Sequence, residues 1–189
     1  MLLIYHWLFT VTWIAFFIYW QVMAINTKTT ERLEPVSSRA LRVLLFAAGI
    51  ALLSYPFPAA WLNLQLLPQG RLSFWAGFAI TVAGLLFCIW ARVHLGRNWS
   101  RSVTIKQDHE LIVTGPYALV RHPIYSGLFA GFIGTGLAVG QVRAVLAFAL
   151  VVLSFWYKLR LEEKWMREQF GAAYEAYTRR VKAVVPWVL

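Results

Sequence analysis

The sequence contains little cysteine and few acidic residues. Cys88 is the single cysteine among 189 residues, so we expect no disulfide framework and no thiol-rich metal site, and we assign Cys88 to packing. Charged residues make up only 14% of the chain, whereas an average soluble domain has about 25%. The four histidines lie on separate segments without the close spacing of a zinc site, so we assign no metal. These shortages exclude a disulfide-stabilised domain and an ordinary soluble enzyme.

Long uncharged stretches take the place of the missing charges, and 60% of the residues are apolar. A helix needs about 20 predominantly apolar residues to cross a bilayer. Five stretches approach or exceed that length: residues 1–27, 43–70, 72–91, 122–142 and 144–157. We therefore predict five transmembrane helices. The first stretch lacks the basic start and the small-residue cleavage site of a secretion signal, so we expect it to remain in the mature protein.

The basic residues are distributed by connection rather than gathered on one soluble face, which argues against nucleic-acid binding as the reason for the net charge of +10. Sixteen of the 18 Lys and Arg residues fall in the first connection, the third connection and the C-terminal tail, and the other two are Arg71 and Arg143. The positive-inside rule then places the N-terminus outside and the C-terminus in the cytoplasm. The small size favours a prokaryotic plasma membrane.

The last two apolar stretches are joined by only a few residues, which favours a short antiparallel helical hairpin. Gly127 and Gly131 are four residues apart, and so are Gly136 and Gly140. Such pairs let a neighbouring helix approach closely, although glycine is also simply common in membrane helices.

The fold class follows from these patterns. The sequence has no glycine-rich strand-to-helix turn of a Rossmann domain. We predict an all-α integral membrane protein with one domain, in which residues 1–93 form three helices. Residues 94–189 would form the cofactor-binding and catalytic half, with the two-helix hairpin followed by an amphipathic cytoplasmic C-terminal helix.

The segment from Leu111 to Gly127 places polar chemistry between two membrane-length apolar runs. Within eleven residues it holds an imidazole, a guanidinium, two phenols and two prolines. Pro123 discourages Arg121 and His122 from extending the following helix backwards. We therefore expect His122 at the mouth of that helix.

After Tyr157 the sequence becomes amphipathic, with a possible break at Gly171. At about 100° per residue, four side chains lie in one stripe about 60° wide: Met166, Phe170, Ala173 and Tyr177. Glu162 and Glu163 border this stripe instead of opposing it, and Lys158 stands one turn before Glu162 on the same face. Carboxylates in that position face protein, lipid headgroups or a ligand, and an ordinary ion pair at the membrane edge is an equally good interpretation.

Two motifs stand across the predicted hairpin, about 35 residues apart. The first, G-P-Y-A-L-V-R-H-P-I-Y-S-G, begins at Gly115, and the second, E-E-K-W-M-R-E-Q-F-G-A-A-Y-E-A-Y, begins at Glu162. Together they resemble the isoprenylcysteine carboxyl methyltransferase family, to which the phospholipid N-methyltransferases are related, over about residues 95–185. The resemblance implies a membrane methyltransferase that uses S-adenosyl-L-methionine, forms S-adenosyl-L-homocysteine, and takes a lipophilic acceptor from the bilayer.

The resemblance also implies a cofactor pocket, carried over residue by residue. Its members would be His109, Glu110, Leu111, Ile112, Tyr117, His122, Pro123, Ile124, Tyr125, Glu162 and Glu163. In the family an arginine four residues before the glutamate contacts the substrate carboxylate, and here Lys158 stands at that position. Lysine is cationic but cannot make the two-pronged pairing of a guanidinium. We predict Lys158 and Arg121 as the catalytic residues.

The chemistry of the acceptor leaves several functions open. Methyl transfer from a sulfonium is a direct displacement, so the site must mainly align the reactants and exclude water. A carboxylate acceptor needs a cation to hold it, whereas an amine must lose a proton and needs a base such as His122. We expect a lipidic or isoprenylcysteine-like carboxylate, with phospholipid or amine N-methylation or thiol S-methylation as the alternative. A sterol-reductase-like NADPH enzyme and a non-catalytic membrane scaffold are further alternatives, and the oligomeric state is open.

Overall fold

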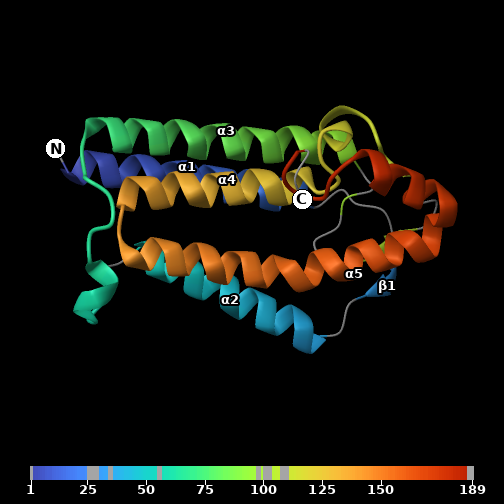
Figure 1. Ribbon diagram of the computed structural model, residues 1–189, viewed down its shortest axis with the longest axis horizontal. Coiled ribbons are helices and arrows are strands. Elements are labelled where there is room, and N and C mark those ends of the chain that lie inside the picture. Colours follow the sequence, from blue (N-terminus) through green and yellow to red (C-terminus); the bar gives the residue numbers. More distant parts are fainter. Residues whose placement is uncertain are drawn as a thin grey trace.

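Five long helices run roughly side by side in the computed structural model, which describes residues 2–24, 30–33, 36–54, 57–96, 99, 104–106 and 111–186 (Figure 1). The helices are α1 (Leu2–Met23), α2 (Val36–Ser54), α3 (Arg71–Leu95), α4 (Pro123–Val139) and α5 (Val142–Arg180). Two short 3₁₀ helices, η1 (Ala60–Asn63) and η3 (Gly115–Ala118), precede α3 and α4. The C-terminal part of α5 folds back over the end of the bundle at which α4 begins (Figure 1).

The packing of α4 depends on glycine. α4 packs along α3 and also contacts α5, and α5 in turn packs along α2. A Cβ atom on Gly84 of α3 would stand 2.5 Å from the carbonyl oxygen of Gly127 on α4. The close approach predicted from the glycine spacing therefore occurs between α3 and α4 rather than within the hairpin. Gly140 ends α4 in the left-handed conformation, with φ 62°, and α5 starts two residues later, as expected for a short connection.

The core beneath the start of α4 is aromatic and apolar. Phe16, Leu85, Cys88 and Leu128 form a buried cluster that joins α1, α3 and α4. Cys88 is fully buried, and its thiol donates to the Ile124 carbonyl oxygen at 3.2 Å. The packing role predicted for Cys88 is thus confirmed.

The helices have the character of membrane spans. Within the described ranges, two segments are both long and apolar enough to cross a bilayer, Arg71–Leu95 and Val142–Phe170, while Trp7–Met23 and Pro123–Val139 are apolar but shorter. Large apolar side chains such as Ile18 and Leu153 are about 60% exposed, which is expected where lipid covers the surface. The count of five spans stays a prediction.

The fold is mostly helical, as predicted, with one addition that the sequence did not indicate. β1 (Thr30–Leu33) and β2 (Thr104–Lys106) pair as a two-stranded antiparallel sheet. This pairing joins two connections that are far apart in sequence, so no local periodicity announces it. The second apolar stretch, residues 43–70, is not one helix: α2 begins at Val36 and ends at Ser54, as the prolines that follow in the sequence favour, and η1 lies in the connection after it.

The C-terminal amphipathic helix is continuous with the fifth apolar stretch. Both belong to α5, which begins at Val142 and keeps helical geometry past Tyr157. The predicted break at Gly171 is confirmed, because this residue has φ 50° and ψ −123° inside α5. The break turns the final stretch of α5 back towards the start of α4 (Figure 1).

Candidate active site

The end of the bundle at which α4 begins collects the polar residues of the two motifs. His122 is the residue before α4 and has non-helical backbone angles, so its imidazole lies at the mouth of that helix as predicted. The chain after α5 returns alongside this segment. The backbone N–H of Arg121 donates to the Lys182 carbonyl at 2.8 Å, and that of His122 donates to the Ala183 carbonyl at 2.9 Å. The C-terminal segment thereby fixes the position of both side chains.

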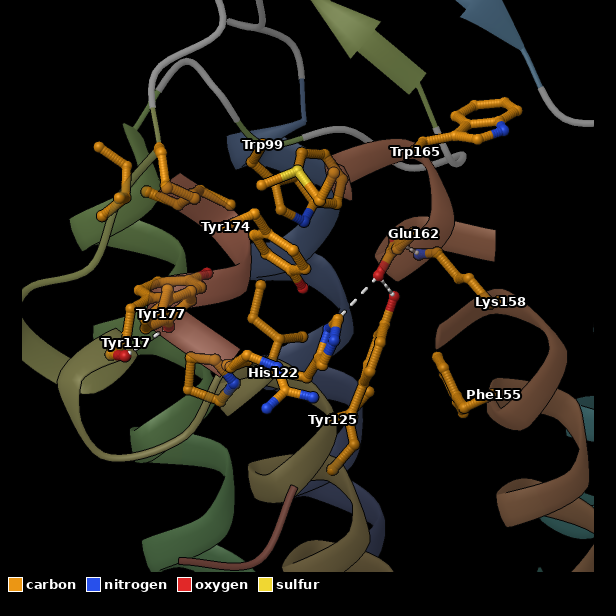
Figure 2. Close-up of a pocket in the computed structure, with 18 of the residues that line it drawn as sticks. Trp99, Tyr117, His122, Tyr125, Phe155, Lys158, Glu162, Trp165, Tyr174 and Tyr177 are labelled. Carbon is orange, nitrogen blue, oxygen red and sulfur yellow. Dashed lines mark hydrogen bonds and ion pairs between the residues drawn. The ribbon is translucent and has the colours of Figure 1, made fainter. Parts of the chain in front are cut away.

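His122, Tyr125 and Glu162 form a compact cluster between α4 and α5 (Figure 2). The Tyr125 hydroxyl donates to Oε2 of Glu162 at 2.6 Å, and Nδ1 of His122 lies 3.6 Å from the same oxygen. The rings of His122 and Tyr125 are stacked, with 5.4 Å between centroids. Lys158 approaches from one turn earlier on α5, where its Nζ atom lies 3.6 Å from Oε1 of Glu162 and 5.4 Å from the Tyr125 ring centroid.

Glu163 enters an ion-pair network with Arg121 and Arg167 and shares the His122 imidazole with Glu162. Its Oε1 accepts from Nε of Arg121 at 2.8 Å and also from Nη2 of Arg121, and it lies 3.3 Å from Nε2 of His122. Arg167 lies 3.5 Å from the second carboxylate oxygen. Glu163 lies beyond the uncharged run of α5, which ends at Tyr157. Burial alone would raise the pKa of Glu163, but the hydrogen bonds and positive charges of His122 and Arg121 lower it to about 2.

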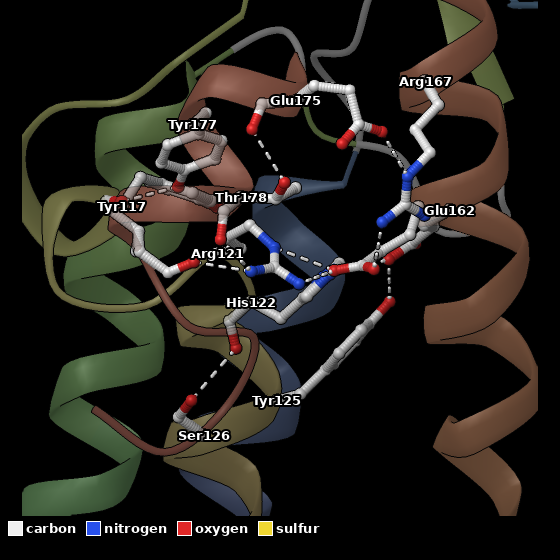
Figure 3. Close-up of polar contacts among 12 residues, drawn as sticks. Tyr117, Arg121, His122, Tyr125, Ser126, Glu162, Arg167, Glu175, Tyr177 and Thr178 are labelled. Carbon is white, nitrogen blue, oxygen red and sulfur yellow. Dashed lines mark hydrogen bonds and ion pairs between the residues drawn. The ribbon is translucent and has the colours of Figure 1, made fainter. Parts of the chain in front are cut away.

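Three tyrosines border the site: Tyr117 of η3, and Tyr174 and Tyr177 in the final stretch of α5. The Tyr177 hydroxyl donates to the Tyr117 carbonyl oxygen at 2.5 Å, which ties the end of α5 to η3 (Figure 3). Burial raises the pKa of Tyr177 to about 12, and it raises the pKa of Tyr174 further above its ordinary value. Both phenols are therefore neutral at physiological pH and serve as rigid, buried walls.

These elements enclose a cavity of about 300 Å³. One end is polar and contains His122, Tyr125, Lys158 and Glu162. The other end is largely aromatic and runs between α1, α2 and α5; Arg42 of α2 also lines the cavity, together with these aromatic residues: Phe16, Phe17, Trp20, Phe46 and Phe155. The cavity is therefore amphipathic along its length, which suits a ligand or a pair of ligands with one polar and one apolar part.

The cavity brings together most of the residues predicted from the sequence. Its lining includes Leu111, Ile112, Tyr117, Arg121, His122, Pro123, Ile124, Tyr125, Lys158 and Glu162. Glu163 does not line it but stands behind Arg121 and His122. His109 and Glu110 lie outside the described residues. Three members of the predicted apolar stripe, Met166, Phe170 and Tyr177, also line the cavity, so the stripe faces protein.

Several lining residues were not found by sequence reasoning. Trp165 and Tyr174 are buried and line the cavity, and both lie within the second motif, although neither was assigned to the site. Trp99 also lines it and stacks under the guanidinium of Arg92, whose Cζ lies 4.3 Å from the ring centroid. Arg92 is almost fully buried and donates to the Met23 carbonyl at 2.6 Å, so it joins α1, α3 and this wall. No spacing rule connects these residues, because they meet only in the folded bundle.

A family model described as phospholipid methyltransferase matches residues 72–173. The chain belongs to this family. The match covers more than half of the chain and includes α3, η3, α4 and the part of α5 that carries Lys158, Glu162 and Glu163. The predicted resemblance to this group of proteins is thus confirmed.

The chain is also similar to individual proteins that are named protein-S-isoprenylcysteine O-methyltransferase. It is 36% identical to the protein of that name from Schizosaccharomyces pombe over 101 residues. This match covers 52% of this chain and 43% of the relative. It is 30% identical over 115 residues to protein-S-isoprenylcysteine O-methyltransferase B from Arabidopsis thaliana, which covers 59% and 58%. The chain spans about half the length of the curated relatives it matches.

A solved structure shares the fold of this phospholipid methyltransferase family member. The eukaryotic intramembrane Ras methyltransferase ICMT, an isoprenylcysteine carboxyl methyltransferase, superposes with a TM-score of 0.53 and 25% sequence identity. The similarity covers 81% of this chain and 50% of that one. The two chains therefore share an overall arrangement of helices.

Proposed function

We propose that this member of the phospholipid methyltransferase family transfers a methyl group from S-adenosyl-L-methionine to a lipidic, isoprenylcysteine-like carboxylate at the membrane surface. The single observation that carries this proposal is the amphipathic cavity. Its polar end is built from His122, Tyr125, Lys158 and Glu162, and its aromatic arm runs between three helices. The names of the relatives support the same acceptor class.

The residues present fit S-adenosyl-L-methionine. The cofactor supplies an electrophilic methyl group on a sulfonium, and it also presents an ammonium, a carboxylate, ribose hydroxyls and an adenine. Glu162, whose side chain is 25% exposed, offers an acceptor for an ammonium or a hydroxyl, and the hydroxyl of Tyr125 holds it in place. The aromatic walls Trp99, Tyr117 and Tyr174 offer surfaces for a ring or a cation. The contacts predicted for Leu111, Ile112, Pro123 and Ile124 are consistent with their places on the cavity wall.

Lys158 is our candidate for holding the acceptor carboxylate. It lines the cavity where the polar end meets the aromatic arm, and it is only 8% exposed. A cation at this boundary can orient a carboxylate attached to an apolar tail, with the tail along Phe46 and Phe155. The enzyme then needs no base, because the carboxylate arrives ionised, and its main work is alignment and exclusion of water.

Arg121, the second predicted catalytic residue, is a candidate for a positioning role. Its guanidinium donates to Glu163 and, through Nη1, to the Val181 carbonyl at 2.5 Å. The first partner stands next to Glu162 on α5 and the second lies just after α5, so the guanidinium bridges these two parts of the chain. Arg121 and Glu163 would therefore fix the position and orientation of the His122 imidazole within the site. The cofactor contacts assigned to His109 and Glu110 stay predictions.

We further propose that the site faces the cytoplasm of a prokaryotic plasma membrane, although most of the relatives are eukaryotic. The support is the excess of basic residues in the connections at the site's end of the bundle. The cofactor would then enter from the cytoplasm and the acceptor from the bilayer, through the aromatic arm between α1, α2 and α5. Five spans with the N-terminus outside are part of this proposal.

An amine acceptor is the second candidate, and one observation favours it. Glu162 is a carboxylate on the cavity wall, within 3.6 Å of the His122 imidazole. This pair could attract a cationic amine and accept its proton. A phospholipid or other lipid amine would use the same aromatic arm, so the two candidates differ only in the group that meets the polar end.

The proposal is tested by binding and by acceptor competition. We expect S-adenosyl-L-homocysteine to bind saturably to the detergent-purified protein in calorimetry, and NADPH to give no heat. Glu162→Gln should weaken that binding while the protein stays folded, because the substitution removes the acceptor charge and keeps the shape. Binding of NADPH in place of S-adenosyl-L-homocysteine would point to a reductase and contradict the proposal.

A further inference from the structure

A second cavity lies at the end of the bundle opposite the candidate active site. Its volume is about 680 Å³, and its wall comes from α1, the end of α2, the start of α3 and the end of α4. The apolar part is formed by side chains from all four helices: Phe9, Trp13, Ile14, Ile50, Leu53, Phe74 and Phe132. Ser54, Gln69, Arg71 and Arg143 also line it. Of the described residues, Phe17 alone lines both cavities.

Both arginines of this second cavity mark the membrane interface. Arg71 is the first residue of α3 and Arg143 is the second residue of α5, so each stands where an apolar helix begins. Arg143 is buried, and its Nη1 atom donates to the carbonyl oxygens of Leu52 and Leu53 at 2.7 and 3.1 Å. Its Nε atom donates to Oε1 of Gln141 at 2.6 Å. These hydrogen bonds hold the guanidinium at the cavity.

The acidic residues lie in other parts of the sequence. All eight fall in the first connection, the third connection and the second half of the stretch that forms α5: Glu31, Glu34, Asp108, Glu110, Glu162, Glu163, Glu168 and Glu175. Glu162 is the nearest to Arg143 along α5; it comes 19 positions later, which corresponds to about 28 Å of helix. Among the residues that the structure describes, no acidic side chain lines the second cavity. The cavity therefore joins a pair of cations to an apolar interior.

We propose that this cavity binds a glycerophospholipid with an anionic headgroup, in the membrane leaflet opposite the candidate active site. An apolar space of this size between membrane helices is suited to an acyl chain, which would lie along Ile14 and Ile50. The phosphate would pair with Arg71 and Arg143, since guanidinium groups match phosphate oxygens. A zwitterionic headgroup would bring its own cation against the two arginines, so the site selects lipids with net negative charge. This binding is independent of the proposed catalytic function.

The test is lipid binding to the purified full chain, with phosphatidylglycerol and phosphatidylcholine of identical acyl chains compared by native mass spectrometry. We expect phosphatidylglycerol to bind more tightly and to raise the melting temperature. Arg71→Gln should weaken its binding about tenfold, as expected for one charge-assisted contact. Ser54→Phe, which fills the cavity without removing a charge, should also weaken it. Arg179→Gln, on the exposed end of α5, is the control and should have no effect.

Several results would overturn the proposal. Equal binding of the two lipids would exclude selection by charge, and unchanged binding in Arg71→Gln would exclude a headgroup contact there. Inorganic phosphate alone, if it stabilised the protein as much as phosphatidylglycerol, would show that the cavity takes a free anion rather than a lipid. Arg143→Gln provides a second measurement; because its carbonyl contacts also support the fold, it is judged by the ratio of affinities for the two lipids. An unchanged ratio in that variant would also contradict the proposal.

Discussion

The buried carboxylate of Glu163 offers the sharpest test of how the site is held together. Its side chain is 9% exposed and is paired with Arg121, whose side chain is 10% exposed. Glu163→Gln keeps the shape but leaves the Arg121 guanidinium buried without its counter-charge. Removing one partner of a buried ion pair costs roughly 3–5 kcal/mol. The new amide oxygen still accepts one hydrogen bond, so we take the lower end, about 3 kcal/mol.

That free energy translates into a measurable change of melting temperature. For a chain of this size each kcal/mol corresponds to roughly 2–4 °C, so we expect Glu163→Gln to lower the melting temperature by roughly 6–12 °C. The assay is thermal unfolding in one detergent, with Glu168→Gln as the matched control on the same helix. The Glu168 ion pair with Lys164 is 3.9 Å long and exposed, and such pairs contribute less than about 1 kcal/mol. Equal shifts in the two variants would refute the reasoning.

The same carboxylate predicts a dependence of stability on pH. The pKa of Glu163 falls from an ordinary 4.5 to about 2 in the folded protein. Because the folded state has the lower pKa, the stabilisation is fully present above about pH 4.5 and is lost as the pH falls towards 2. Wild-type protein should therefore lose stability in this window more steeply than Glu163→Gln does, and parallel curves would contradict the assignment.

Three further predictions concern the cavity and the bundle. Tyr125→Phe removes the hydroxyl that holds Glu162 and should weaken S-adenosyl-L-homocysteine binding about fivefold to tenfold in calorimetry, whereas unchanged affinity would exclude this contact. Lys158→Gln should leave cofactor binding intact and lower the turnover of a carboxylate acceptor, so loss of cofactor binding would show that its role is different. Gly84→Ala places a methyl group 2.5 Å from a carbonyl oxygen of α4 and should cost about 1–3 kcal/mol of stability. Gly70→Ala is the control, because Gly70 has open space around it. Equal melting temperatures of the two variants would contradict the close packing of α3 and α4.

Much of this site could be predicted because its residues lie in two continuous stretches of sequence. Pro123 determines where α4 begins, so the position of His122 at its mouth follows from local chemistry alone. The helical period of α5 likewise places Lys158 and Glu162 on one face. The two carboxylates that follow each other in sequence point in different directions, 100° apart, which explains why Glu162 lines the cavity and Glu163 does not.

The remaining features depend on contacts between distant segments. The hydrogen bonds from Arg121 and His122 to Lys182 and Ala183 join two pieces of chain that share no pattern. The pairing of β1 with β2 is of the same kind, because two short strands in separate connections carry no periodicity. The aromatic arm combines α1, α2 and α5, and in each helix its residues are indistinguishable from ordinary lipid-facing aromatics.

The central claim is tested most directly by methyl transfer with a label on the methyl group of S-adenosyl-L-methionine. The purified protein would be incubated with a prenylated cysteine, a lipid amine and a lipid thiol in parallel, and each product would be treated with alkali. A carboxyl methyl ester is cleaved by alkali, whereas N-methyl and S-methyl products are not. The account predicts alkali-labile label on the prenylated cysteine, and a large loss of that label in Glu162→Gln. Label that survives alkali, or S-adenosyl-L-homocysteine binding without transfer to the prenylated cysteine, would contradict it.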